Sequence, residues 1–498
     1  MKKFFYLLFS ALFCVFCTFS LSGCKNREVD KISKNLNTYA ISAELDTQKM
    51  EISGSEKVTY KNDTNVELDA VLFHLYPRAF REGAIVKPYT ALNEASCFPN
   101  GISYGDIQIL KVTVNGVVQR HELVGEDEDI LRVGLGFKLK PNKTVEIVID
   151  FVVTIPNSTH RFGYFENNIN LGNWYPILCK FEGENWDTSP YYSTGDPFFS
   201  DMANYEVNFK FPSEFVMTST GESEISQTGE ICTAKISAKA VRDFAFVLSK
   251  NAKVLSSKVG DVSVFYLAYN GDTNADKMLE VSKDALEFFS KNFGQYPYST
   301  LTVAKTPFLF GGMEYPNIVL ISDSVADDEE FMKVIVHEIA HQWWYGIVGN
   351  NEIKEAWLDE SLSEYSTALF FNAYPKYEVT YEEFVENALS SYLLYVDVIE
   401  TIRGEVNTKM NLAVNEYQNE YEYSYMVYVK GVIMFDSLKT AVGEKKLMAG
   451  LKKYYENNKF KVASKSDFYD AFKSACHSDL VNFFEGYLNG TAVITNLN

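Results

Sequence analysis

Apolar and polar residues alternate in short runs through the first half of the chain, from Thr38 to about Lys258. This period of two is typical of β-strands that bury one face. The clearest runs are 39–45, 57–60 and 145–153. Asn115-Gly116 separates two further apolar runs and predicts a two-residue hairpin turn. The interval 167–201 has no clear period, so we expect it to form long loops packed on an antiparallel sheet.

The period changes near Asn274, where apolar residues begin to recur at spacings of three and four. Strand-like pieces at 301–306 and 317–321 flank the loop 311–316, and almost everything after Asp327 predicts helix. The predicted helices are 328–346, 352–373, 380–400, 426–441, 443–457, 466–476 and 478–488.

Together the two patterns predict an α+β protein with two domains. An N-terminal antiparallel β-domain is expected at 38–258, and a mainly helical domain at 259–498. The boundary between them rests on the change of period alone, since no low-complexity linker or internal repeat marks it.

The first residues have the composition of an export signal. Two lysines precede an apolar run from Phe4 to about Phe19, and Leu-Ser-Gly-Cys24 follows. That sequence resembles the lipobox of bacterial lipoproteins, in which the cysteine carries a lipid. We expect a signal peptide at 1–23, a lipid anchor on Cys24, a tether at 24–37, and a protein held at the cell envelope outside the cytoplasmic membrane. The alternative is an uncleaved signal anchor, because about 20 apolar residues can span a bilayer.

Composition narrows the classes of function. The chain has 46 Lys and Arg against 66 Asp and Glu, a formal net charge of −20, which excludes a basic nucleic-acid binder. The cysteines beyond the predicted anchor are Cys97, Cys179, Cys232 and Cys476. They lack CxxC spacing and could form at most two disulfides, in three connectivities, so we do not expect a thiolate metal site.

A metal-binding spacing lies within the first predicted helix after Asp327. In His337-Glu338-x-x-His341, the two histidines lie about 40° apart on one helix face, so both imidazoles can reach one ion. Zinc binds such neutral nitrogens at about 2.0 to 2.1 Å. Glu338, rotated by about 100° from His337, suits a base that acts on water beside the ion. The alternative is a pair of core or surface histidines one turn apart.

Glu360 is the candidate for the third protein ligand that a catalytic zinc requires. A short turn through 346–351 and a second, antiparallel helix would bring it back beside the two histidines. Two histidines and one glutamate leave a fourth position of a single zinc ion open for water, which is a catalytic arrangement. Glu364, one turn further, is either a carboxylate that orients an imidazole or a solvated helix acid.

These motifs resemble the M1 family of zinc metallopeptidases, the aminopeptidase N and leukotriene hydrolase group. The resemblance rests on the His-Glu-x-x-His motif, on Trp357-Leu-Asp-Glu360 and on Gly311-Gly-Met-Glu314. Stretches that resemble the family's N-terminal domain are 170–176, 196–201 and 241–246. The resemblance covers roughly 38–490 and implies a β-domain followed by a thermolysin-like (gluzincin) catalytic domain, here in a short bacterial lipoprotein form.

The resemblance also implies a reaction, the hydrolysis of peptide bonds with removal of N-terminal residues. Glu314 would hold the free α-ammonium of the peptide substrate through a charge-assisted hydrogen bond, which contributes about 1.5 to 3 kcal/mol. Tyr428, in Tyr428-Val-Lys-Gly431, would donate a hydrogen bond to the developing oxyanion. Zinc would polarise the carbonyl and acidify water, while Glu338 would transfer the proton to the leaving amine.

The chain departs from the family pattern at two places near the expected amine site. Tyr315 stands where Asn is usual, and the family's Thr-Gln-x-Glu element is missing before Trp174, with Glu166 only a poor match. Two alternatives therefore stay open, an endopeptidase with an open cleft and a non-catalytic lipoprotein that binds zinc or peptides. The intact Glu338 argues against the second, because a binding protein needs no base beside the ion.

Overall fold

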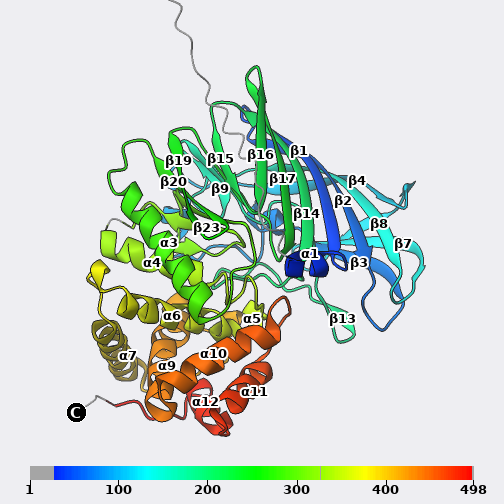
Figure 1. Cartoon of the computed structure of the whole chain (residues 1–498). Coiled ribbons are helices and arrows are strands. Elements are labelled where there is room, and N and C mark those ends of the chain that lie inside the picture. The colour runs from blue at the N-terminus through cyan, green and yellow to red at the C-terminus, as the bar shows by residue number, and fades with distance from the viewer. Residues whose placement is uncertain (1–26, 326, 496–498) are drawn as a thin grey trace, which may run out of the picture.

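The computed structural model describes residues 27–325 and 327–495. The predicted signal peptide and Cys24 lie outside this part of the chain. An N-terminal half built from sheets lies against a C-terminal half built mostly from helices (Figure 1). This arrangement confirms the predicted α+β fold class. Within the described ranges, no helix is both long and apolar enough to cross a membrane.

The largest sheet has eight strands and is antiparallel except where β1 pairs with β14. Alternate residues of strands such as β14 point into the core, as the period of two predicted. Asn115 and Gly116, with φ of 48° and 79°, join two of the strands and confirm the predicted hairpin. In spatial order the strands are β16 (Glu222–Thr228), β17 (Ile231–Val241), β14 (Ala203–Pro212), β1 (Asn37–Asp46), β2 (Glu51–Lys61), β8 (Thr144–Thr154), β4 (Asp106–Val114) and β5 (Val117–Val118).

Two four-stranded sheets and a short hairpin complete the N-terminal half. The first sheet contains β15 (Val216–Ser219), β18 (Phe246–Ser249), β10 (Asn168–Leu171) and β9 (Phe162–Phe165). The second contains β11 (Ile177–Leu178), β3 (Leu68–His74), β7 (Ile130–Leu139) and β6 (His121–Val124), and the hairpin pairs β12 (Phe181–Glu182) with β13 (Asn185–Trp186). The expectation of loops at 167–201 is thus wrong for β10, β11, β12 and β13. All residues of β10 and β11 are buried, so the sequence shows no alternation there. β12 and β13 have only two residues each, too few to show a period.

A five-stranded sheet links the β-rich half to the helices. Its strands, in spatial order, are β19 (Ala252–Val259), β20 (Val262–Tyr269), β21 (Thr300–Thr306), β23 (Ile318–Ser322) and β22 (Gly312–Met313). β20, β21 and β23 run parallel, and α3 (Ala275–Asn292) connects the first two. The predicted boundary between residues 258 and 259 falls inside the hairpin of β19 and β20. The short edge strand β22 places Glu314 immediately after it.

The helical half follows the five-stranded sheet. Its helices are α4 (Asp328–Ala340), α5 (Glu352–Glu355), α6 (Glu360–Ala373), α7 (Tyr381–Arg403), α8 (Glu420–Ser424), α9 (Lys430–Val442), α10 (Glu444–Asn458), α11 (Lys465–Cys476) and α12 (Val481–Leu488). Two further helices, α1 (Arg27–Ser33) and α2 (Glu94–Cys97), lie in the N-terminal half. α4 packs against both α3 and α6. The helix predicted at 328–346 ends at Ala340, because a turn that includes Tyr345, with φ of 113°, reverses the chain.

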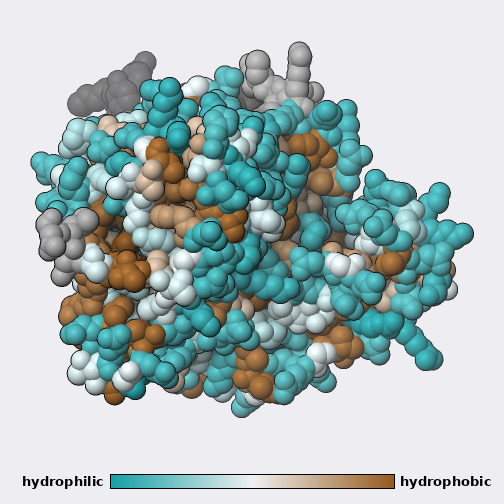
Figure 2. All heavy atoms as spheres, turned by 90° about the horizontal axis from the view of Figure 1, so that it is seen from below, coloured by the Kyte–Doolittle hydropathy of each residue, from teal (hydrophilic) through white to brown (hydrophobic). Residues whose placement is uncertain are grey.

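The surface of the helical half is mixed when seen from below (Figure 2). Hydrophobic side chains gather toward the side on which α7 lies, and this helix exposes Leu394, Val398 and Ile402. The cysteines of the described chain are buried and free, so the structure pairs none of Cys97, Cys179, Cys232 and Cys476.

Candidate active site

Two helices, α4 and α6, position the predicted metal ligands, and the short helix α5 lies between them in the sequence. Asp327 caps α4 by accepting hydrogen bonds from the backbone N–H groups of Glu329 and Glu330. His337 lies in the last turn of this helix and His341 directly after it, with the N–H of His341 bonded to the carbonyl of His337. Both imidazoles are buried and point to the same side, as the spacing predicted.

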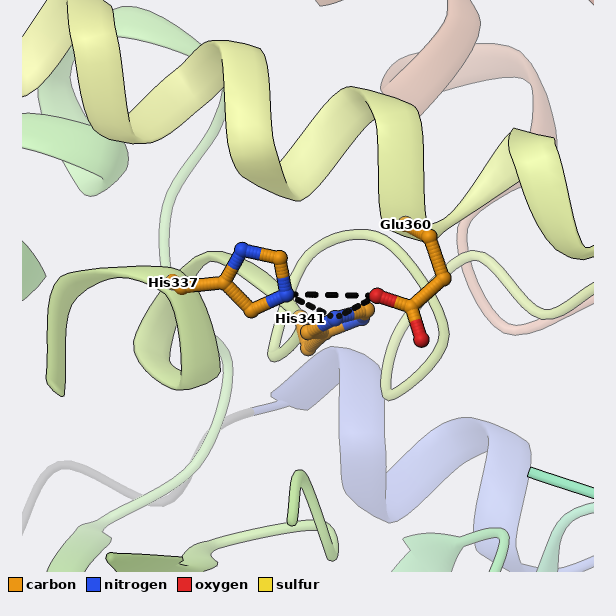
Figure 3. Close-up of side chains that lie close together, drawn as sticks. All are labelled: His337, His341 and Glu360. Carbon is orange, nitrogen blue, oxygen red and sulfur yellow. Dashed lines mark hydrogen bonds and ion pairs between the residues drawn. The ribbon is translucent and has the colours of Figure 1, made fainter. Parts of the chain in front are cut away.

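Glu360 reaches the two histidines from the start of α6. The helix predicted at 352–373 is interrupted before Glu360, and Asp359 caps the new helix by accepting the Glu360 N–H. Three side-chain atoms then form a small triangle (Figure 3). His337 Nε2 lies 3.2 Å and His341 Nε2 lies 3.1 Å from Glu360 Oε2, and the two nitrogens are 3.0 Å apart.

The outward-facing ring nitrogens show that this triangle fits a zinc ion. His337 Nδ1 lies 2.7 Å from Glu364 Oε2, and His341 Nδ1 lies 3.0 Å from the carbonyl oxygen of Trp344. These oxygens accept the Nδ1 protons, so both Nε2 lone pairs point into the triangle. Bonds of about 2.0 to 2.1 Å to a tetrahedral zinc would separate such ligand atoms by roughly 3.3 Å, close to the distances found. Glu364 is only 27% exposed and orients His337 directly.

Charge accounts for the protonation of this cluster. Burial lowers the pKa of His337, but bonds to Glu360 and Glu364 outweigh burial and raise it well above its usual value. Burial likewise raises the pKa of Glu360, but the two imidazoles outweigh it and hold this pKa below its usual range. Glu360 is therefore a carboxylate, and a divalent cation would compete with protons for the histidines.

Glu338 lies beside the triangle and not in it. The side chain is buried, and its Oε2 has no hydrogen-bond partner among the described residues. Burial raises the pKa of Glu338 to about 7, while the two neighbouring histidines lower it. A Cβ on Gly312 would lie only 2.3 Å from Glu338 Oε1, so the glycine lets β22 pack directly on this carboxyl group.

Tyr428 approaches the triangle from a π-helical turn, Tyr425–Val429, between α8 and α9. Its hydroxyl donates a hydrogen bond to Glu360 Oε1, and its ring stacks on His337 with centroids 5.7 Å apart. Burial, and then the charge of Glu360, raises the pKa of Tyr428 well above its usual value. The phenol therefore keeps its proton at neutral pH and can act as a donor.

Glu314 is buried near the same site. Its Oε1 has no hydrogen-bond partner among the described residues, and burial, followed by the charge of Asp196, raises its pKa well above the usual value. The next residue explains one departure from the family pattern. Tyr315 donates a 2.6 Å hydrogen bond to Asn173 Oδ1, and a Cβ on Gly172 would overlap the phenol. The tyrosine thus ties the Glu314 segment to the N-terminal half.

Sequence reasoning gave no role to Asp196, the acid whose charge raises the pKa of Glu314 most. Asp196 pairs with Arg161 at 2.6 Å, and the Arg161 guanidinium lies over the Phe310 ring, just before the Gly-Gly loop. Burial raises the pKa of Asp196 although Arg161 lowers it. Glu166 is instead exposed on the turn between β9 and β10. The resemblance of 196–201 to the family's N-terminal domain was the only signal for Asp196.

Gln342 was also missed, although it directly follows His341. Its amide is buried and bonds to the backbone of the Glu314 segment. Apart from its place after the second histidine, nothing in the sequence indicated this contact.

Comparison with known proteins places this geometry in context. Residues 277–487 match the Peptidase family M1 domain. The chain is similar to aminopeptidase N of Lactobacillus helveticus, at 24% identity over 73% of this chain and 44% of the relative. It is similar to aminopeptidase N of Lactococcus lactis subsp. lactis, at 22% identity over 76% of this chain and 46% of the relative. The chain thus spans about half the length of these curated relatives.

A solved structure extends the likeness to nearly the whole fold. An M1 zinc metallopeptidase from Deinococcus radiodurans superposes with a TM-score of 0.65 at 13% identity, covering 92% of this chain and 94% of the other. At that identity the likeness concerns the fold, which includes both the β-rich and the helical halves.

Proposed function

Since residues 277–487 belong to peptidase family M1, we propose that this chain is a zinc-dependent aminopeptidase that removes N-terminal residues from peptides. One observation carries the proposal. A triangle of donors suited to zinc lies next to two buried acids, Glu338 and Glu314, and each has an oxygen without a hydrogen-bond partner in the described part of the chain. A purely structural zinc site would be closed by a fourth protein ligand and would not need these acids.

The metal ligands, Glu338 and Tyr428 each have a separate role in the proposed reaction. When bound by His337, His341 and Glu360, zinc supplies a Lewis acid that polarises the substrate carbonyl and acidifies water. Glu338 takes a proton from the attacking water at its free Oε2 and delivers it to the leaving amine. Tyr428 turns its hydroxyl from Glu360 to the developing oxyanion.

Glu314 restricts the substrate to peptides with a free N-terminus. Burial raises the pKa of Glu314, and an ammonium group would favour its ionised form, because the cation replaces lost solvation. Arg161 already balances the charge of Asp196, so the substrate ammonium supplies the positive charge that Glu314 lacks. A charge-assisted bond of about 1.5 to 3 kcal/mol corresponds to roughly 10- to 150-fold selection over a blocked peptide.

The test compares Glu338→Gln with wild type on a panel of fluorogenic aminoacyl amides, with and without a zinc chelator. We expect the variant to keep zinc and to lose about two to four orders of magnitude in kcat. Glu330→Gln makes the same change on the exposed side of α4 and should retain activity. Wild-type turnover in Glu338→Gln, or no turnover of any substrate by zinc-replete wild type, would contradict the proposal.

An acetylated copy of the best substrate distinguishes the alternative activity. An aminopeptidase should cleave the free-amine peptide at least about tenfold better than its acetylated copy. Equal cleavage of both would favour an endopeptidase with an open cleft.

For the anchor and the location, the proposal rests on the first residues of the sequence. Leu-Ser-Gly-Cys24 after a basic and apolar segment supports lipid attachment to Cys24 and a position at the cell envelope, outside the cytoplasmic membrane. Labelled palmitate should be incorporated by wild type and not by Cys24→Ala. Wild-type protein without lipid would contradict this part of the proposal.

A further inference from the structure

The amide of Gln342 connects the metal-binding helix to the segment that carries Glu314. Its Oε1 accepts a 2.8 Å hydrogen bond from the backbone N–H of Asn317. Its Nε2 donates to the carbonyls of Glu314 and Tyr315, at 3.3 and 3.2 Å. Gln342 is 1% exposed, so water does not offer these backbone groups an alternative partner.

The segment that Gln342 binds is a tight turn. The N–H of Ile318 bonds to the carbonyl of Tyr315 at 3.1 Å, with Pro316 and Asn317 at the two central positions. Asn317 has a φ of 63°, and proline followed by a residue of positive φ is typical of a type II turn. Glu314 directly precedes this turn. A shift of the turn would therefore move the Glu314 backbone with it.

We propose that Gln342 is a positioning residue, which holds the Glu314 carboxylate at a fixed distance from the metal ligands. His341 and Gln342 are adjacent, so the same turn of chain fixes one ligand of the ion and the carrier of Glu314. This inference rests on the proposed function. The fixed distance makes the bond cleaved next to a free N-terminus the one that is presented to the metal.

A purely structural role predicts a different outcome from a positioning role. A structural amide would lower stability, and its loss would affect all substrates alike. A positioning amide should change the preference for free-amine substrates, because only these contact Glu314. The measured quantity is therefore the ratio of kcat/KM for a free-amine fluorogenic peptide to that for its acetylated copy, together with zinc content.

Gln342→Met keeps the length of the side chain and removes both hydrogen-bonding functions. We expect the ratio to fall about tenfold, mainly through a higher KM for the free-amine peptide, with zinc content unchanged. Gln342→Glu is nearly isosteric and keeps an acceptor for Asn317, but it cannot donate to the two carbonyls. Gln342→Glu should lower the ratio as well, and it replaces Gln342→Met in the test if that variant folds poorly.

Trp343→Phe is the matched control. It removes another buried hydrogen bond at the neighbouring position, from Trp343 Nε1 to the Gly294 carbonyl at 2.8 Å, without touching the Glu314 turn. We expect lower stability and an unchanged ratio. In a Glu314→Gln background, Gln342→Met should lower the ratio no further, because the two changes act through one carboxylate.

Two outcomes overturn the inference, and they differ. A high wild-type ratio that Gln342→Met and Gln342→Glu preserve overturns the positioning role alone. A wild-type ratio near one removes the aminopeptidase premise and the inference together.

Discussion

The metal ligands and the acids around Glu314 serve one site but are built in different ways. His337, His341 and Glu360 lie close together in the sequence, at the end of α4 and the start of α6, and the spacing of the two histidines follows from the helical repeat. Glu314 lies after an edge strand, and Asp196 with Arg161 comes from the N-terminal half. Local geometry therefore places the ligand triangle, whereas the packing of the two halves places the acids around it.

The largest expected effect comes from changing a metal ligand. Glu360→Ala should reduce zinc from about one ion per chain to almost none and lower kcat/KM by more than about 10⁴-fold. The Lewis acid and the water on which Glu338 acts are both lost in this variant. Metal analysis and kinetics on the same preparation give the answer. Stoichiometric zinc in Glu360→Ala would show that the third ligand is another residue.

Tyr428→Phe should have the next largest effect. We expect kcat to fall by about 10²- to 10³-fold with zinc content unchanged, because only the oxyanion donor is removed. Tyr425→Phe is the control, since the Tyr425 ring stacks on Tyr395 at 4.3 Å instead of contacting Glu360. If Tyr428→Phe and wild type had equal kcat values, the Tyr428 side chain would contribute only to packing.

Variants of Glu314 and Asp196 should change the preference for free-amine peptides more than they change turnover. Glu314→Gln should lower kcat/KM for a free-amine peptide by roughly 10- to 150-fold and barely affect its acetylated copy. Asp196→Asn should lower it by about tenfold, because the unbalanced Arg161 charge then repels the substrate ammonium. If Asp196→Asn affects both peptides equally, Asp196 belongs to the fold and not to selectivity.

Glu364→Gln should have the smallest effect on activity, because it should change the affinity for zinc and not the selectivity for substrate. The carboxylate orients His337 through its Nδ1 at 2.7 Å, and loss of such a partner typically weakens zinc binding by about 10- to 100-fold. Competition with a chelator of known affinity measures the change, and kcat at saturating zinc should stay close to wild type. An unchanged affinity for zinc would show that Glu364 is a surface acid without a role in metal binding.

The same contrast explains how much of the site could be predicted. The positions of His337, His341 and Glu360 follow from residues per turn and one reversal of the chain, so spacing alone brought them together. Gln342 could not be assigned, because its partners are backbone groups of a turn whose position depends on the five-stranded sheet. Asp196 could not be assigned either, because its contact with Arg161 depends on how separate loops pack.

The predicted strands agree with the structure where only one face of a strand is buried. The strands of the large sheet alternate and were expected, whereas β10 is buried throughout and was not. The long helix predicted at 352–373 is divided because Asp359 caps α6. A cap within an apolar repeat changes no spacing, yet it places Glu360 at the first residue of its helix.

The free cysteines carry a practical consequence. Since Cys97, Cys179, Cys232 and Cys476 are buried as thiols, the architecture of the described chain depends on no covalent cross-link. A reducing environment should therefore support the same fold. A recombinant host with a reducing interior would suffice to produce it, and a phosphine reductant that leaves metals alone could stay in the buffer throughout.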